Sequence, residues 1–116
     1  KLFEAEFGKV PAHVVIYGID GPLCFGAAQT FTETIGKIGD QHRVLILRMR
    51  HVPFIDATGL HRLADIIRTM ERRNVRVLLT DVVEEVEHSL REAGVIREGM
   101  LFADMRSALD AAYRNS

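Results

Sequence analysis

Apolar runs alternate with amphipathic segments along most of this 116-residue chain. Residues 13–19, 43–49 and 75–79 are rich in β-branched and other large apolar side chains, a composition typical of strands. The run Val-Leu-Ile-Leu at 44–47 has no polar residue at alternate positions, so we expect a strand that is buried on both faces of a sheet. Shorter strands are predicted at 23–25 and 100–102.

Between the strands, apolar residues recur at the three- and four-residue spacing of amphipathic helices. Asp81 with Glu84 is expected to cap the third of these helices, which would end at Gly94. Asp104 is expected to cap the last helix. The patterns predict four helices, over residues 26–38, 58–73, 81–93 and 104–112.

The resulting order of elements, β-β-α-β-α-β-α-β-α, is typical of an α/β fold with right-handed crossovers between parallel strands. Asp20, Gly21 and Pro22 form a turn signal, so the first two strands are predicted to pair as an antiparallel hairpin. We therefore expect a mixed sheet, mostly parallel with an N-terminal hairpin, and about four α-helices. Residues 1–12 are interpreted as a linker or lead-in arm, and residues 13–116 as one domain.

Composition narrows the classes of function. The formal charge of −1 argues against a nucleic-acid binder, which usually carries a basic excess. Cys24 is the single cysteine, so no internal disulfide can form, which is consistent with a reducing compartment. No run approaches the roughly 20 apolar residues of a transmembrane helix, and no signal peptide is visible. The chain starts with Lys1 rather than methionine, so we expect it to be part of a longer protein.

The junction at residues 52–60 is the strongest candidate for a functional site. It leads from a predicted strand into a predicted helix, where open α/β folds commonly bind ligands and partners. Asp56 is placed to accept backbone N–H bonds at the helix start, Thr58 adds a hydroxyl, and Gly59 would allow another chain or a ligand to come close. The local pattern alone equally fits a simple helix cap.

Known catalytic and cofactor motifs are missing. The sequence has no glycine-rich phosphate loop and no GxSxG elbow. No two of its five histidines have the i, i+4 spacing of a helical metal pair. Cys24 lies in an apolar segment and is interpreted as a core residue. The acids at 81–87 suit the positive end of a helix dipole better than a catalytic cluster. We therefore predict no catalytic residue, metal or cofactor.

Arginines supply a second candidate surface. Arg48 and Arg50 share one face at the end of the strand at 43–49, and Arg68 and Arg72 lie toward the end of the following helix. A solvated charged face is the simpler interpretation. The alternative is that these arginines contact an acidic protein, a phosphate or anionic lipid headgroups.

Three motifs together resemble the STAS domain, which is named for sulfate transporters and anti-sigma-factor antagonists. They are VPFIDATGL at 52–60, IDGPLCFGAA at 19–28 and LREAG at 90–94. The second motif is similar to the opening of STAS domains at the cytoplasmic C-terminus of SulP-type anion transporters. The resemblance spans residues 14 to about 112.

The resemblance implies a non-enzymatic regulatory domain of a SulP-type transporter of sulfate or another anion, on the cytoplasmic side of the inner (plasma) membrane. Its implied partners are the transmembrane domain of the same transporter, cytosolic proteins and a second copy through a homodimer of the parent, but no nucleic acid. The implied contacts lie at residues 56–59, at the second helix and at Asp20, Gly21 and Pro22.

Two departures from the family pattern bear on function. Stand-alone antagonist relatives are switched by phosphorylation of a Ser or Thr directly after the motif's Asp, and here that position is Ala57, which has no hydroxyl. Thr58 is the remaining hydroxyl that could accept a phosphate. Arg48 and Arg50 replace the acidic or small polar residue found in many relatives. An anti-sigma-factor antagonist or signalling scaffold remains an alternative, as does a nucleotide hydrolase. Guanine-nucleotide binding, proposed for some relatives, has no supporting motif here.

Overall fold

The computed structural model describes residues 10–24, 32–33, 35–36 and 38–114. Within these residues, four strands form the sheet, and their bounds are β1 Val14–Asp20, β2 Val44–His51, β3 Arg76–Thr80 and β4 Leu101–Phe102. Three named helices accompany them, and their bounds are α3 Ala57–Arg72, α4 Glu84–Glu92 and α5 Met105–Arg114. The predicted α/β class is confirmed.

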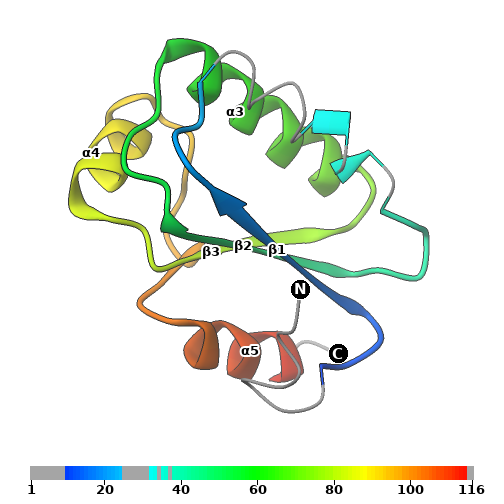
Figure 1. Ribbon diagram of the computed structural model, residues 1–116. Helices are drawn as coiled ribbons and strands as arrows, with labels where there is room; N and C mark the ends of the chain where they lie inside the picture. The colour runs from blue at the N-terminus through cyan, green and yellow to red at the C-terminus, as the bar shows by residue number, and fades with distance from the viewer. Residues whose placement is uncertain (1–9, 25–31, 34, 37, 115–116) are drawn as a thin grey trace.

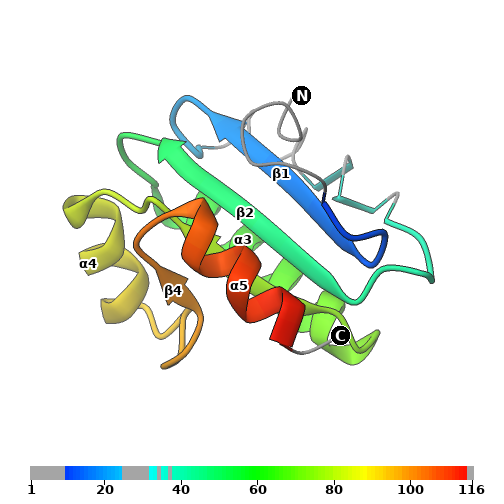
Figure 2. The same ribbon diagram turned by 90° about the horizontal axis from the view of Figure 1, so that it is seen from below.

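The strands lie side by side in the order β1-β2-β3-β4, and all three pairs are parallel. Figure 2 shows β1 and β2 side by side and running in the same direction. The predicted antiparallel hairpin is therefore wrong for the described residues. Leu23 makes a parallel bridge to Ile55 instead of pairing with β1, because residues 20–24 cross the carboxyl end of β2 rather than turning back. Residue 25 of the predicted short strand lies outside the described residues.

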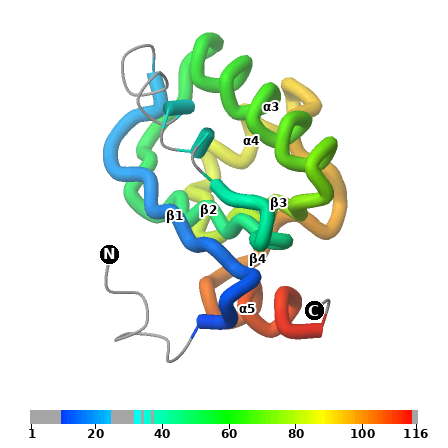
Figure 3. The backbone as a smooth tube through the Cα atoms, turned by 90° about the vertical axis from the view of Figure 1, so that its right-hand side faces the viewer, coloured from blue at the N-terminus to red at the C-terminus, as the bar shows by residue number. Residues whose placement is uncertain are grey.

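Helices cover both faces of the sheet, with α3 and α4 on one face and α5 on the other (Figures 1 and 3). Side chains alternate between the faces along each strand. In β2, Leu45 and Leu47 belong to the core under α3 and α4, whereas Val44 and Ile46 belong to the core under α5. The fully buried run at 44–47 therefore has the two-sided cover that its sequence predicts.

The helix ends follow the sequence with one exception. Asp104 caps α5, since the Ser107 N–H donates to Asp104 Oδ1 at 2.9 Å, and Gly94 has φ +68° just beyond α4. The predicted capping pair at Asp81 is wrong. Asp81 itself has φ +59°, and α4 begins three residues later at Glu84, with no side-chain cap.

The helix predicted over 26–38 lies largely outside the described residues. Thr32, Glu33 and Ile35 have helical conformation, and the Gly36 N–H donates to the Thr32 carbonyl at 3.1 Å. Ile35 is buried in the same core as α3. This short stretch therefore lies beside α3 on the face of the sheet opposite to α5.

Candidate interaction loop at the start of the helix α3

The connection from β2 to α3 occupies residues 52–56 at the carboxyl end of the sheet. Val52 and Ile55 are buried, which anchors the connection at two points three residues apart. Phe54 lies between these anchors and is 50% exposed. Phe54 is one of three exposed large apolar side chains among the described residues, with Val83 and Tyr113.

Asp56 caps the helix, as the sequence predicts. Its backbone is extended, and its Oδ1 accepts a hydrogen bond of 2.8 Å from the Gly59 N–H. The Leu60 N–H donates to the Asp56 carbonyl at 2.8 Å, which closes the first turn of α3. Asp56 thus fixes the direction in which α3 leaves the sheet, and its carboxylate faces the positive end of the helix dipole.

The two sequence motifs at 20–24 and 52–60 meet in space. The Leu23 N–H donates to the Phe54 carbonyl at 3.1 Å, and the Asp56 N–H donates to the Leu23 carbonyl at 3.3 Å. Two residues before Leu23, the Gly21 N–H donates to the His51 carbonyl at 2.9 Å, with Gly21 at φ +89°. The segment 20–24 therefore acts as a clamp that holds the start of α3 from the side of β1. We call these residues the Leu23 clamp.

Gly59 has a different role from the one predicted. A Cβ at this position would lie 2.0 Å from the Leu23 carbonyl oxygen and 2.8 Å from Ile55 Cγ1. Gly59 is buried, so the segment that comes close to it is the Leu23 clamp of the same chain, and a partner cannot reach it. The glycine is required for this close approach of the Leu23 clamp to α3.

The exposed part of the loop carries one charged side chain, Asp56, beside small and apolar ones. Ala57 and Asp56 are exposed and Thr58 is partly exposed. Together with His61 and Arg62, Ala57 and Thr58 line a shallow open depression on the first two turns of α3. A phosphate on Thr58 would add negative charge at this helix start, where the dipole favours it.

The predicted arginine contacts fall on opposite sides of the molecule. By the alternation of β2, Arg48 and Arg50 follow Val44 and Ile46 onto the α5 face. Arg68 and Arg72 are exposed on α3, which covers the other face. The four arginines therefore cannot contact one ligand together, although Arg48 and Arg50 do share a face as predicted.

The arginines of α3 are already engaged locally. Arg68 is paired with Asp65, and Arg72 Nη2 donates to Thr69 Oγ1 at 3.4 Å. Arg73, beyond the end of the helix, donates to the Ile38 carbonyl at 2.5 Å. Exposed pairs of this kind contribute about 0–1 kcal/mol each, so they shape the surface charge more than the stability.

Two features of this site were missed by sequence reasoning. The exposure of Phe54 could have been predicted, because buried apolar residues at 52 and 55 leave the two residues between them, Pro53 and Phe54, on the exposed side. For Leu23 the sequence predicts a hairpin strand, and only the tertiary arrangement reveals that it bridges to Ile55.

Among the described residues, no group of three or more His, Cys, Asp or Glu side chains could hold a metal ion. No helix in this part of the chain is long and apolar enough to cross a bilayer.

The fold and the loop define a small parallel α/β domain that presents a capped helix start beside an exposed aromatic residue. The family model that matches it is the STAS domain, over residues 9–108. This match covers most of the chain, and the chain therefore belongs to the STAS domain family. None of the curated proteins matches it significantly.

Several solved structures are similar to this chain. A sulfate transporter family protein from Wolinella succinogenes is 37% identical, with a TM-score of 0.85 over 92% of this chain and 91% of that one. The SulP transporter STAS domain from Vibrio cholerae is 31% identical, with a TM-score of 0.80 over 98% of this chain and 91% of that one. The murine Slc26a9 anion transporter is 27% identical, with a TM-score of 0.81 over 92% of this chain and 19% of that one.

Anti-sigma-factor antagonists share the fold. Unphosphorylated SpoIIAA superimposes with a TM-score of 0.74 at 17% identity, over 91% of this chain and 93% of that one. At this identity the likeness concerns the fold alone. The domain architecture is thus common to transporter domains and to stand-alone antagonists.

Proposed function

We propose that this chain is the regulatory, non-enzymatic domain of a SulP-type anion transporter and lies on the cytoplasmic side of the membrane. The observation that carries the proposal is the 37% and 31% identity, over nearly the whole chain, to domains described as sulfate transporter family and SulP transporter STAS domains. In the murine Slc26a9 transporter, the matching part is 19% of the chain. The transmembrane part of the same protein is therefore the first partner to consider.

The contact surface in this proposal is the exposed start of α3 with Phe54. The Leu23 clamp and the Asp56 cap hold this surface in one geometry, so a partner would meet it without ordering it first. Ala57 and Thr58 give the surface little charge of their own, and the 50% exposed ring of Phe54 adds apolar area. A mixed surface of this kind is typical of contacts between domains of one protein.

A stand-alone antagonist is the second candidate, and its support is the fold likeness to SpoIIAA. Antagonists depend on a hydroxyl directly after the motif's Asp, and Ala57 has none. This candidate therefore requires that phosphorylation takes place at Thr58 instead, or that control by phosphorylation has been lost. Incubation of the domain with a partner kinase and labelled ATP would support it only if Thr58 were phosphorylated.

The first test of the transporter proposal is the parent gene. We expect the coding sequence upstream of Lys1 to specify many apolar spans of about 20 residues each. A parent that encodes this domain without such spans would remove the transporter proposal and leave the antagonist.

The second test examines the surface in the full-length parent, reconstituted in vesicles and assayed for sulfate uptake. Phe54→Ser and Ala57→Glu change the surface without touching a buried side chain, so we expect altered uptake with an unchanged melting temperature of the isolated domain. Arg106→Gln, exposed on α5 at the opposite face, is the matched control and should transport normally. Normal uptake by both loop variants would contradict a contact role for this surface.

A further inference from the structure

The outer face of α3 is basic, although the chain as a whole has a formal charge of −1. Toward the end of this helix, Arg68, Arg72 and the C-cap residue Arg73 are all exposed, and Asp65 is the acid beside them. The helix α4 has the opposite character, with four glutamates and one arginine over Glu84–Glu92. The two helices on this side of the sheet therefore present surfaces of opposite charge.

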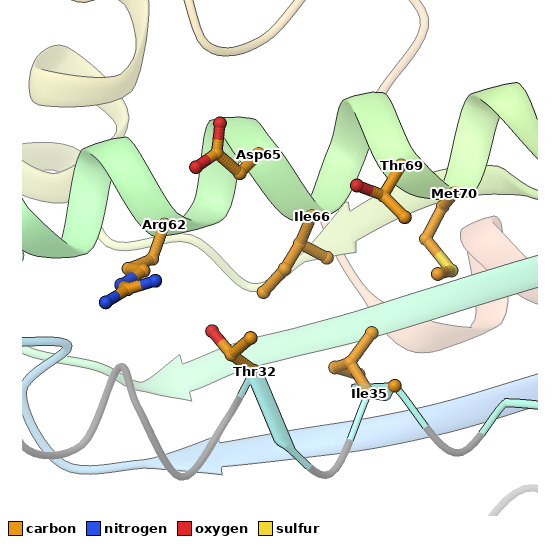
Figure 4. Close-up of a pocket in the computed structure, with 8 residues that line it drawn as sticks. Thr32, Ile35, Arg62, Asp65, Ile66, Thr69 and Met70 are labelled. Carbon is orange, nitrogen blue, oxygen red and sulfur yellow. The ribbon is translucent and has the colours of Figure 1, made fainter.

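The charged residues lie on the side of α3 that is turned away from the core. Ile66 is buried, and in Figure 4 it points from α3 toward Ile35, whereas the Asp65 carboxylate is directed away from Ile35. Arg68 and Arg72 follow Asp65 at spacings of three and four residues, so the three side chains succeed one another along one face of the helix. This face is open to solvent along the second half of α3.

The hydrogen bonds of two of these arginines leave their charge in place. Arg72 Nη2 donates to the Thr69 hydroxyl at 3.4 Å, and Arg73 Nη2 donates to the Ile38 carbonyl at 2.5 Å. Both acceptors are uncharged. A guanidinium has five N–H donors in a planar fork, so each of these arginines keeps donors that suit a phosphate group.

Arg43 extends the basic surface beyond the end of α3. It directly precedes β2, is exposed, and donates through Nη1 to the Asp40 carbonyl at 2.5 Å. The Asp40 carboxylate in turn lies 4.0 Å from Arg73 Nη2, so Arg43 and Arg73 flank the same loop. The arginine face, as we call this surface, comprises four residues, Arg43, Arg68, Arg72 and Arg73.

The acids within this surface are too few to cancel it. Asp65 is paired with Arg68, and Asp40 lies beside Arg73. Four arginines against two acids leave a formal charge of +2. A surface of this charge attracts anionic groups weakly in solution and more effectively when they are held nearby.

The length of α3 indicates which anionic groups are held nearby. In the function proposed above, the start of α3 contacts the transmembrane part of the parent. The helix has 16 residues and is therefore about 24 Å long. With its start at the transmembrane part, its other end extends over the lipid beside the transporter. The cytoplasmic leaflet contains anionic lipids and attracts basic segments that lie close to it.

We propose that the arginine face binds the anionic phospholipid headgroups of the cytoplasmic leaflet next to the transporter. The guanidinium groups donate to phosphate oxygens, and the contact holds α3 along the membrane surface. This inference rests on the proposed function, because that function places the domain beside a membrane. It adds a second contact, with lipid, at the end of the helix whose start contacts the protein.

The experiment is sedimentation of the 116-residue chain with vesicles made of equal parts of phosphatidylglycerol and phosphatidylcholine. We expect binding at about 0.01 M salt, where the Debye length is about 30 Å, and release at about 1 M salt, where it is about 3 Å. Vesicles of phosphatidylcholine alone should bind far less of the protein, because they carry no net charge.

Two double variants test whether the arginine face makes the contact. Each arginine near an anionic surface strengthens binding about fivefold, so Arg68→Gln with Arg72→Gln should weaken it about 25-fold. Arg91→Gln with Arg106→Gln is the matched control and should bind normally. It removes the same charge from α4 and α5, and it also includes one paired arginine, since Arg91 Nε donates to Glu87 at 2.9 Å.

A third variant should strengthen binding, which a loss of folding could not do. Asp65→Asn removes an exposed acid from the arginine face and releases Arg68 from its ion pair, so we expect binding about fivefold tighter. Thermal melting of all the variants checks that the fold persists.

Several outcomes would overturn the proposal. Equal weakening by the two double variants would show that only the net charge matters. Binding that resists salt, or that is equal on phosphatidylcholine alone, would show that headgroup charge is not recognised. Binding of a glutamate-rich peptide without binding of the vesicles would identify the arginine face as a docking site for an acidic protein.

This proposal and the proposed function can fail separately. Vesicle binding is measured on this chain alone, whereas the transporter proposal is decided by the parent gene and by uptake. Apolar spans upstream of Lys1 together with no vesicle binding would remove only the lipid contact. A parent without such spans would remove the proposed function whatever the vesicles show.

Discussion

Gly59 is the residue at which the sequence of the loop and its structure are most tightly linked. The motif places a glycine three residues after Asp56, and the same N–H that the carboxylate caps belongs to this glycine. Its α-carbon is also the point at which the Leu23 carbonyl comes closest to α3. One small residue therefore serves both the cap and the clamp.

Gly59→Ala is expected to destabilise the domain by about 3 kcal/mol, because the new methyl group would overlap a backbone oxygen that cannot move alone. Urea unfolding of the two proteins measures the difference. Asp56→Ala serves as a comparison, since it removes only the cap and should cost about 1 kcal/mol. Equal stability of Gly59→Ala and the parent chain would mean that the clamp opens without cost.

Thr80 presents a buried hydroxyl at the end of β3. The residue is completely buried, and its Oγ1 has no hydrogen-bond partner among the described residues. Thr80→Val replaces this hydroxyl by a methyl of similar size, so we expect an unchanged or higher free energy of unfolding, by up to about 1 kcal/mol. Thr80→Ser keeps the hydroxyl and loses a methyl, and it should be destabilising. Destabilisation by valine would indicate that the hydroxyl is bonded in solution.

The N-terminus of α5 gives the domain a pH-sensitive element. The Ser107 backbone N–H donates to Asp104 and holds the pKa of its carboxyl below the ordinary value of 3.8, and the Ser107 hydroxyl and nearby Arg106 act in the same direction. A carboxyl with a lowered folded pKa stabilises the native state above its unfolded pKa. This contribution is lost as the pH falls through the lower, folded pKa.

We therefore expect the stability difference between the parent chain and Asp104→Asn to be largest above pH 5 and to shrink below pH 4. Because Asp104 is exposed, the change should be small, and carbon-detected NMR titration of the carboxyl is the direct measurement. A titration midpoint above 3.8 would show that the cap is not formed in solution.

Features that are determined by residues close together in the chain could be predicted from the sequence. The buried run at 44–47, the cap at Asp56 and the helix end at Gly94 each depend on residues within one turn or one strand. The spacing of Asp81 to Glu84 predicts a helix cap, yet the backbone of Asp81 takes the left-handed conformation. Its N–H is directed to the Phe102 carbonyl at 3.3 Å, a contact 21 positions away that no local pattern reveals.

The candidate site was predicted in part for the same reason. The loop residues Asp56 to Gly59 belong to one short motif, so their position at a helix start followed from the pattern. Whether the four arginines share one surface could not be predicted from the sequence. The answer depends on which face of the sheet carries Arg48 and which face α3 covers. Only the three-dimensional order of the layers separates Arg48 and Arg50 from Arg68 and Arg72 (Figure 1).

The molecule as a whole depends on the Leu23 clamp to join β1 to the α3 layer. Leu23→Ala removes a completely buried side chain and should cost about 2–5 kcal/mol. If the clamp opens as a unit, hydrogen exchange should accelerate together at the amides of Gly21, Leu23 and Asp56 and remain slow in β3. Uniform acceleration throughout the sheet would instead show that the domain opens only globally.

The parallel order of the sheet also determines how the domain can assemble. Paired residues such as Val14 and Val44, or Leu45 and Val77, are about thirty positions apart, and the described sheet contains no hairpin that could form first. Bringing such distant strands together costs conformational entropy before their pairing stabilises the chain, and this slows folding. Leu23 reaches Ile55 across a similar span, so the start of α3 obtains its neighbour only after distant parts of the chain have met. A fragment beginning after residue 24 would retain the motif at 52–60 and lack the backbone against which that motif is shaped.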